Sequence, residues 1–142
     1  MIFNSLLIAN RGEIACRIIK TARDMGIRSV AVYVDADKDA LFVKEADEAI
    51  RLVDGGYLDS KQIINAAKKS GAQAIHPGYG FLSENANFAR VLEENNITFI
   101  GASSKHIEMM GDKIQAKKIA KENGLPIIEG SEGGVKNIKE AK

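Results

Sequence analysis

Residues 76–81, with the sequence His-Pro-Gly-Tyr-Gly-Phe, place a histidine and two aromatic rings in a short turn after an apolar run. The apolar run predicts a strand, and open parallel sheets bind small molecules at the carboxyl ends of their strands. Glycines on both sides of Tyr79 allow the main chain to approach a ligand closely, while the ring offers an apolar face. The pattern therefore predicts a small-molecule contact. A tight strand-to-helix connection that needs glycine and proline only for its shape is the alternative.

His76 precedes Pro77, which biases the histidine toward extended backbone at the end of the strand. A single histidine in such a place is more often a structural hydrogen-bonding residue than a general base, so we predict a supporting role for it. Tyr79 and Phe81 also have a plainer interpretation, in which they only cover the carboxyl edge of the sheet.

The turn Asn10-Arg11-Gly12-Glu13 stands where a dinucleotide-binding turn would lie. Such a turn requires three glycines, so that pyrophosphate can sit on free amides at the start of the helix. Only Gly12 is present, and Glu13 places a carboxylate where the phosphate charge would go, which Coulomb repulsion opposes. Asp35 follows the second expected strand, where a ribose-binding acid would stand, but it is a weak signal without the glycines. We therefore reject NAD and expect Glu13 to interact with the positive end of the helix dipole.

The helix expected over residues 13–25 has an apolar stripe at helical spacing and a charged opposite side. The stripe consists of Ile14, Ile18, Ala22 and Met25, and the charged side of Arg17, Lys20, Arg23 and Asp24. A face of mixed charge is either a solvated surface or a subunit contact in which arginine is the anchor. Cys16 lies beside Lys20 and Arg23, which could lower the pKa of its thiol, but no base partner indicates a nucleophile.

Asp112 is the expected N-cap of the last helix and places Lys113 at the first helical position. Amide donors at a helix start and a cation there could together hold an anion such as phosphate. The spacing alone favours a plainer interpretation, in which Lys113 is an ordinary surface lysine on a lysine-rich helix.

Short β-type runs alternate with helical patterns along the chain, with Ser60 and Ser83 as expected N-caps. Strands are expected at 5–9, 28–34, 48–52, 73–75 and 97–100, and helices at 13–25, 40–46, 60–69, 84–95, 104–110 and 113–123. This alternation calls for right-handed crossovers. It predicts an α/β fold, a doubly wound parallel sheet with helices on both faces.

The composition excludes several classes of protein. The 142 residues include 20 basic and 19 acidic ones, so the net charge of +1 offers no field for nucleic acid or an anionic membrane. The apolar first nine residues are too short to span a bilayer and lack the pattern of a signal peptide. Cys16 is the single cysteine and cannot form an internal disulfide, and no Cys/His cluster indicates a metal site. A cytoplasmic, metal-free fold is expected.

Pro126 ends the last full helix, and residues 129–134 form a polar, glycine-rich stretch before a short tail at 137–142. The tail has no apolar face to bury. We therefore expect the sequence to stop within a longer protein, with a frayed natural C-terminus as the alternative.

The chain resembles the N-terminal part of biotin carboxylase, the ATP-dependent component of carboxylases that act on acetyl-CoA, propionyl-CoA or pyruvate. The similarity is carried by residues 8–15 (IANRGEIA), 57–58, 74–87 (AIHPGYGFLSENAN), 99–101 and 110–113. The resemblance implies a pre-ATP-grasp, Rossmann-like domain over residues 1–111. Residues 112–142 would be a linker helix and the start of an ATP-grasp domain.

The family uses MgATP to activate bicarbonate and carboxylates biotin held on a carrier protein, working with a carboxyltransferase. The resemblance implies that Tyr79, Gly80 and Phe81 contact biotin, with support from His76, Pro77 and Gly78. It likewise implies that Lys113 reaches the phosphates of ATP. A homodimer contact is implied for Arg17, Lys20 and Asp24, although arginine is common where Lys20 stands.

The family's glycine-rich loop, magnesium ligands and bicarbonate-binding residues belong to a region that these 142 residues do not include. We therefore expect no metal ligand here, no tight binding of ATP, Mg²⁺ or biotin, and no turnover of ATP by this chain alone. Two alternatives are a non-catalytic dimerisation or carrier-docking module and the front domain of another ATP-grasp ligase, such as a carbamoyl phosphate synthetase relative. A dehydrogenase is the least favoured interpretation.

Overall fold

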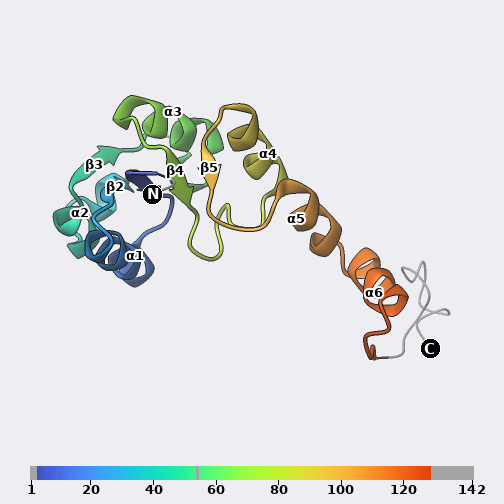
Figure 1. Ribbon diagram of the computed structural model, residues 1–142. Coiled ribbons are helices and arrows are strands. Elements are labelled where there is room, and N and C mark those ends of the chain that lie inside the picture. The colour runs from blue at the N-terminus through green and yellow to red at the C-terminus, as the bar shows by residue number, and fades with distance from the viewer. Residues whose placement is uncertain (1–2, 54, 129–142) are drawn as a thin grey trace.

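A computed structural model describes residues 3–53 and 55–128, in which five parallel strands form one sheet of order β3-β2-β1-β4-β5 (Figure 1). The strands are β1 (Ser5–Ile8), β2 (Arg28–Tyr33), β3 (Glu48–Arg51), β4 (Ala74–His76) and β5 (Thr98–Phe99). The polar stretch at 129–134 and the tail at 137–142 lie outside the described residues. All five predicted strands are present, with ends within two residues of the predicted ones.

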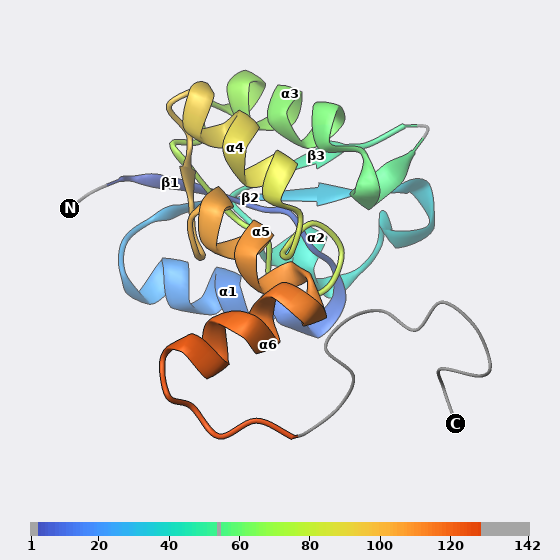
Figure 2. The same ribbon diagram turned by 90° about the vertical axis from the view of Figure 1, so that its right-hand side faces the viewer.

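Helices cover both faces of this sheet (Figure 2). They are α1 (Gly12–Asp24) and α2 (Leu41–Glu45) on one face, and α3 (Ser60–Ser70) and α4 (Ala86–Glu94) on the other. The central strands are buried on both sides because their side chains alternate between two cores. Leu6 and Ile8 pack with α1, whereas Leu7 and Ile75 pack with α3 and α4. The predicted doubly wound parallel sheet is confirmed.

Two predicted N-caps are wrong by one or two residues. The carboxylate of Asp59, not Ser60, caps α3 by accepting hydrogen bonds from the amides of residues 61 and 62. Asn85, not Ser83, caps α4 and accepts from the amide of Phe88 at 2.9 Å. Residues 80–85 form turns instead of a first helical turn, because the Ser83 amide donates to the Gly80 carbonyl and Leu82 is buried. The predicted cap at Asp112 is confirmed.

The apolar stripe of α1 is broader than predicted and stops earlier. Ile14, Ile18 and Ala22 are buried as expected, and Ala15 and Ile19 join them. Met25 is exposed, because the helix ends at Asp24 and Met25 already belongs to the C-terminal turn.

Two further helices, α5 (Ser104–Gly111) and α6 (Lys113–Glu122), extend away from the sheet (Figure 1). Glu93 of α4 holds the start of α5 by accepting from the amide and hydroxyl of Ser104 at 3.1 and 3.0 Å. Arg90 of α4 also pairs with Glu108 of α5. By contrast, α6 has no buried residue.

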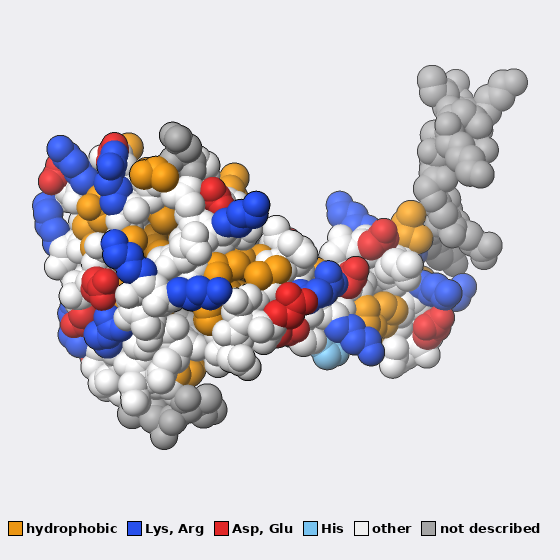
Figure 3. All heavy atoms as spheres, turned by 90° about the horizontal axis from the view of Figure 1, so that it is seen from above, with side chains coloured by type: hydrophobic (Ala, Val, Ile, Leu, Met, Phe, Trp, Pro, Cys, Tyr) orange, Lys and Arg blue, Asp and Glu red, His pale blue; other side chains and the backbone are white. Residues whose placement is uncertain are grey.

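Basic and acidic side chains are interspersed over the face seen in Figure 3, as the near-neutral composition predicts. Within residues 3–53 and 55–128, no helix has the length and apolar character needed to cross a bilayer.

Candidate functional site at the edge of the sheet

The turn after β1 and the loop after β4 meet at one edge of the sheet. The two strands are neighbours and parallel, with Ile8 opposite His76, and the Ala9 amide donates to the His76 carbonyl at 2.9 Å. The chain runs outward from β1 to β3 and then crosses to β4 on the other side of β1. Ligands of open α/β sheets bind at the carboxyl edge at such a reversal of strand order. Residues 76–81 therefore lie where the fold favours a ligand.

Asn10 ties the two segments together. Its side chain is buried, with 3% of the residue exposed. The Nδ2 group donates to the carbonyls of Pro77 at 2.8 Å and Tyr79 at 2.9 Å, and Oδ1 accepts from the Arg11 amide at 2.9 Å. Gly78 passes so close that an added Cβ would lie 2.6 Å from Nδ2, and its φ is +66°. Only glycine fits this position, because both space and backbone conformation exclude a side chain.

His76 has the structural hydrogen bond that its position suggested. Its Nδ1 accepts from the Gly78 amide at 3.0 Å, which requires Nδ1 to be unprotonated. Burial lowers the pKa of His76, and the nearby positive charge of Arg17 lowers it further. The neutral ring therefore supports the turn, as expected for a residue that shapes a loop.

Three residues of the loop face outward. Tyr79 is 59% exposed and its hydroxyl donates to the Glu13 carboxylate, which raises the pKa of Tyr79. Gly80 has open space where a Cβ would stand. Phe81 has a φ of +43° and stacks its ring on Tyr57, with centroids 5.5 Å apart and planes 7° from parallel. An accessible ring beside an accessible main chain could contact a small molecule with both apolar and polar groups.

Arg17, Lys20 and Asp24 lie on one exposed face of α1, as predicted. Within the described residues none of the three forms an ion pair. Arg23 instead donates to the Glu45 carbonyl at 2.7 Å and so links α1 to α2.

The prediction of a lowered pKa for Cys16 is wrong. Burial raises the pKa of the Cys16 thiol, and the negative charge of Glu45 raises it further. Cys16 faces the junction of α1 with α2, where desolvation outweighs the basic residues along its own helix.

Lys113 is exposed at the first position of α6, but the helix amides do not form a site with it. Asp112 Oδ1 already accepts from the amides of Ile114 at 2.8 Å and Gln115 at 3.0 Å. Two of the amides that could have joined Lys113 in holding an anion are therefore occupied, and the ammonium group is exposed. The structure does not bring Lys113 to the loop at 76–81, because α6 stands well away from it (Figure 1).

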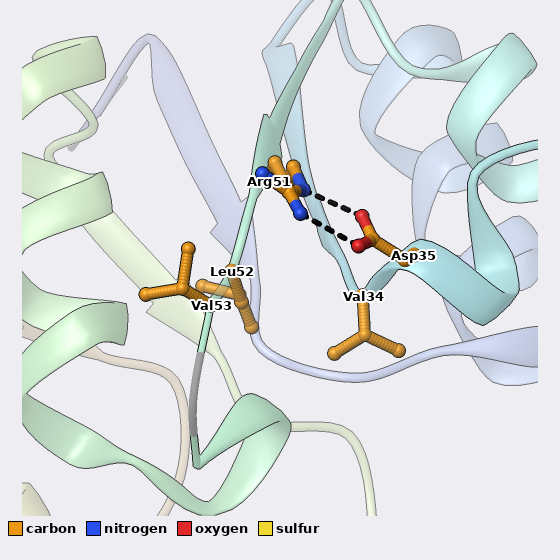
Figure 4. Close-up of a pocket in the computed structure, with 5 residues that line it drawn as sticks. All are labelled: Val34, Asp35, Arg51, Leu52 and Val53. Carbon is orange, nitrogen blue, oxygen red and sulfur yellow. Dashed lines mark hydrogen bonds and ion pairs between the residues drawn. The ribbon is translucent and has the colours of Figure 1, made fainter.

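A shallow depression of about 370 Å³ lies elsewhere, at the carboxyl ends of β2 and β3 (Figure 4). It is lined by Val34, Asp35, Arg51, Leu52 and Val53. Both carboxylate oxygens of Asp35 accept from Arg51, at 2.5 and 2.6 Å. The acid that would have bound a ribose is therefore paired with arginine, which agrees with the rejection of NAD.

Sequence reasoning missed a partly buried network behind the loop. Arg11 donates to both oxygens of Asp37, through Nε at 2.7 Å and Nη2 at 2.5 Å. The Tyr57 hydroxyl also donates to Asp37, at 2.6 Å. The two bonded pairs are 26 and 20 positions apart, and only the folded strands bring the three residues together. Among the described residues, no group of three or more His, Cys, Asp or Glu side chains could hold a metal ion.

Residues 2–107 match the family model described as "Biotin carboxylase, N-terminal domain". The chain belongs to this family. Similar curated proteins include biotin carboxylase 1 of Bacillus subtilis, 52% identical over 96% of this chain and 31% of its own length. The propionyl-CoA carboxylase alpha chain of Ruegeria pomeroyi is 51% identical over 98% of this chain and 21% of its own length. The chain thus spans about a fifth to a third of these relatives.

Solved biotin carboxylase structures have the same fold. The biotin carboxylase domain dimer of Hydrogenobacter thermophilus 2-oxoglutarate carboxylase, in complex with MgADP, ADP and bicarbonate, superposes with a TM-score of 0.95. It is 47% identical, with 99% of this chain and 32% of that one covered. A Campylobacter jejuni biotin carboxylase in complex with a β-γ-ATP compound gives 0.93 at 45% identity, covering 98% and 32%. The resemblance inferred from the sequence and the Rossmann-like, pre-ATP-grasp fold are confirmed.

Proposed function

We propose that this protein acts in the ATP- and bicarbonate-dependent carboxylation of biotin carried on a partner protein, and that the loop at 76–81 contacts the biotin. The supporting observation is the position of the loop in a biotin carboxylase family chain. It lies at the carboxyl edge beside the strand-order reversal, with Tyr79 and Gly80 accessible.

The residues present fit biotin as one wall of a pocket. The Tyr79 ring offers an apolar face, and the exposed Gly80 main chain offers polar groups to a ureido ring. Phe81, half-covered by Tyr57, extends the apolar wall. His76 would take no proton from the substrate, because its Nδ1 is engaged by Gly78 and its ring is partly buried. The loop would therefore bind and orient biotin without supplying a catalytic group.

Among the site residues proposed here, Lys113 is the one that fits a role in binding MgATP. Lys113 would contact a phosphate through its ammonium group, which lies exposed at the start of α6. Bound ATP and Mg²⁺ would supply the phosphoryl transfer that activates bicarbonate. No acidic cluster suited to a metal occurs among the described residues, so we propose that other parts of the enzyme hold Mg²⁺. The family match to residue 107 supports a first domain at 1–111, with 112–142 leading into an ATP-grasp domain.

We further propose a homodimer contact at Arg17, Lys20 and Asp24, which is supported by their shared exposed face and by the dimer of the Hydrogenobacter thermophilus relative. A biotin carboxyl carrier protein and a carboxyltransferase are the proposed functional partners. A cytoplasmic location agrees with the single cysteine, although the alpha chains of some relatives are mitochondrial.

A titration with free biotin tests the proposed contact. Millimolar biotin should shift the backbone amide signals of Tyr79 and Gly80 in the nuclear magnetic resonance spectrum of this chain. Tyr79→Ala should abolish the shifts. Met25→Ala is the matched control, because Met25 is comparably exposed but follows the last turn of α1, at the opposite edge of the sheet. Shifts that avoid the loop, or that persist in Tyr79→Ala, would contradict the proposal.

A further inference from the structure

The Arg11–Asp37–Tyr57 network reaches the loop through a ring stack. Asp37 and Tyr57 are 7% and 8% exposed, so their mutual hydrogen bond is shielded from water. Three donors point at the two oxygens of Asp37: two from Arg11 and one from the Tyr57 hydroxyl. The hydrogen bond holds the hydroxyl end of Tyr57 in place, and burial of the residue restricts its ring. The Phe81 ring lies nearly parallel to the Tyr57 ring.

Phe81 requires support from its surroundings. Its φ of +43° lies in the left-handed region, which costs a bulky residue of order 1–2 kcal/mol and persists only where the surroundings impose it. Leu82, the next residue, is buried and anchors the following turn. The Tyr57 ring, stacked on Phe81, supplies part of that support.

Two adjacent residues of one turn therefore act on opposite ends of the loop. Asn10 holds the carbonyls of Pro77 and Tyr79 directly. Arg11 acts on Phe81 indirectly, through Asp37 and Tyr57. Gly80 lies between the two held points, and its carbonyl accepts from the Ser83 amide at 2.9 Å.

We propose that the turn at Asn10 and Arg11 is a positioning device for the loop, and that Asp37 and Tyr57 are positioning residues that set the conformation of Tyr79, Gly80 and Phe81. This assigns a role to the turn that lacks the glycines of a nucleotide site. The inference rests on the proposed function only in naming biotin as the molecule that the positioned loop contacts.

A surface ion pair would not do this work. The Arg51–Asp35 pair has the same bidentate geometry, but its carboxylate is 68% exposed whereas that of Asp37 is 9% exposed, and no third donor among the described residues joins it. It touches no residue of the loop. Arg51→Lys is therefore the matched control for Arg11→Lys, since each change replaces a planar two-donor group by a single ammonium.

Amide hydrogen exchange of this chain tests the inference. Arg11→Lys and Tyr57→Phe should each speed exchange at the hydrogen-bonded amides of the loop and its following turn, Gly78, Ser83 and Asn85, by about tenfold, the effect expected from losing one hydrogen bond to a charged group. Tyr57→Phe keeps the aromatic ring and removes only the hydroxyl group that donates to Asp37. The slowest amides of β1 should change less than twofold, and Arg51→Lys should leave the loop unchanged. A role limited to overall stability would instead speed the exchange of β1 and the loop by the same factor.

Biotin binding by the same variants gives the second measurement. The dissociation constant for biotin should rise about fivefold in Arg11→Lys and Tyr57→Phe, and not in Arg51→Lys. If the loop amides of the variants exchange at the rates of the unmodified chain, the inference is overturned, whether or not the affinity for biotin changes. If exchange is faster but wild-type biotin shifts are absent, the inference holds and the proposed function fails.

Discussion

Gly78 and Gly80 are two residues apart in one loop, yet their surroundings differ. Both have φ near +65°, but a side chain at Gly78 would meet Asn10, whereas one at Gly80 would meet nothing. Asn10 cannot move aside without losing its two hydrogen bonds to the loop. Substitutions at the two glycines therefore separate the free-energy cost of backbone strain from that of a steric clash.

We expect Gly78→Ala to lower the free energy of unfolding by about 2–3 kcal/mol, since strain and displacement of Asn10 add. Gly80→Ala should cost only about 1 kcal/mol, from strain alone. Urea denaturation followed by circular dichroism measures both changes. Equal effects of the two substitutions would show that the contact with Asn10 does not limit the loop.

The Tyr57 hydroxyl makes stability depend on pH in the alkaline range. Burial, together with the hydrogen bond to Asp37, raises the pKa of Tyr57 to about 12 from the usual 10. The folded state therefore keeps this proton more tightly than the unfolded state. Its contribution to stability is fully present below pH 10 and is lost as pH rises toward 12.

The advantage in unfolding free energy of the unmodified chain over Tyr57→Phe should shrink by up to ~2 kcal/mol between pH 10 and pH 12. Denaturation of both proteins at several pH values in this window measures it. Subtracting the variant removes the titration of the lysines and of the other tyrosines. A difference that stays constant with pH would contradict the buried hydroxyl–carboxylate bond.

At the scale of elements, helix α1 has one face for the sheet and an opposite, exposed face that we propose contacts a second copy of the chain. Reversing two charges with Arg17→Glu and Lys20→Glu should abolish concentration-dependent self-association, because the proposed contact depends on complementary charge. Sedimentation equilibrium should then give the monomer mass of 15.4 kDa at all concentrations.

The same reversal at Lys61 and Lys69 is the control. Both are exposed on α3, which covers the other face of the sheet. If self-association is lost with the change on α3 and kept with the change on α1, the contact does not lie on α1 and the proposal is contradicted.

The elements were predictable because their signals are local. Apolar, β-branched runs such as residues 29–34 predict strands, and the periodic stripe of α1 predicts its buried face. The N-cap residue of α4 was not predictable, because serine and asparagine are both good caps and the burial of Leu82 decides between Ser83 and Asn85. The outward loop at 76–81 was predictable from glycine spacing. The network of Arg11, Asp37 and Tyr57 was not, because no local pattern links residues so far apart.

At the scale of the whole molecule, we propose that the described residues provide part of an active site. They offer exposed residues at 79–81 and an exposed lysine at the start of α6, but no acidic cluster for a metal. Phosphoryl transfer needs metal and several positive charges around the transferring group.

This chain alone should therefore show no ATP hydrolysis that depends on both bicarbonate and biotin. Release of inorganic phosphate, with and without each of the two substrates, measures it. The matched sample without protein sets the background rate. A rate that requires both substrates would contradict the proposal that other parts of the enzyme hold Mg²⁺ and complete the site.

The junction of α4 with α5 has a mechanical consequence. No residue of α6 is buried, and α5, which precedes it, is held on α4 by Glu93 at Ser104 and by Arg90 at Glu108. A helix of ten residues is about 15 Å long, so α6 acts as a lever whose far end magnifies any rotation at this joint. A small change of angle where α5 rests on α4 would therefore displace the far end of α6 more than its near end.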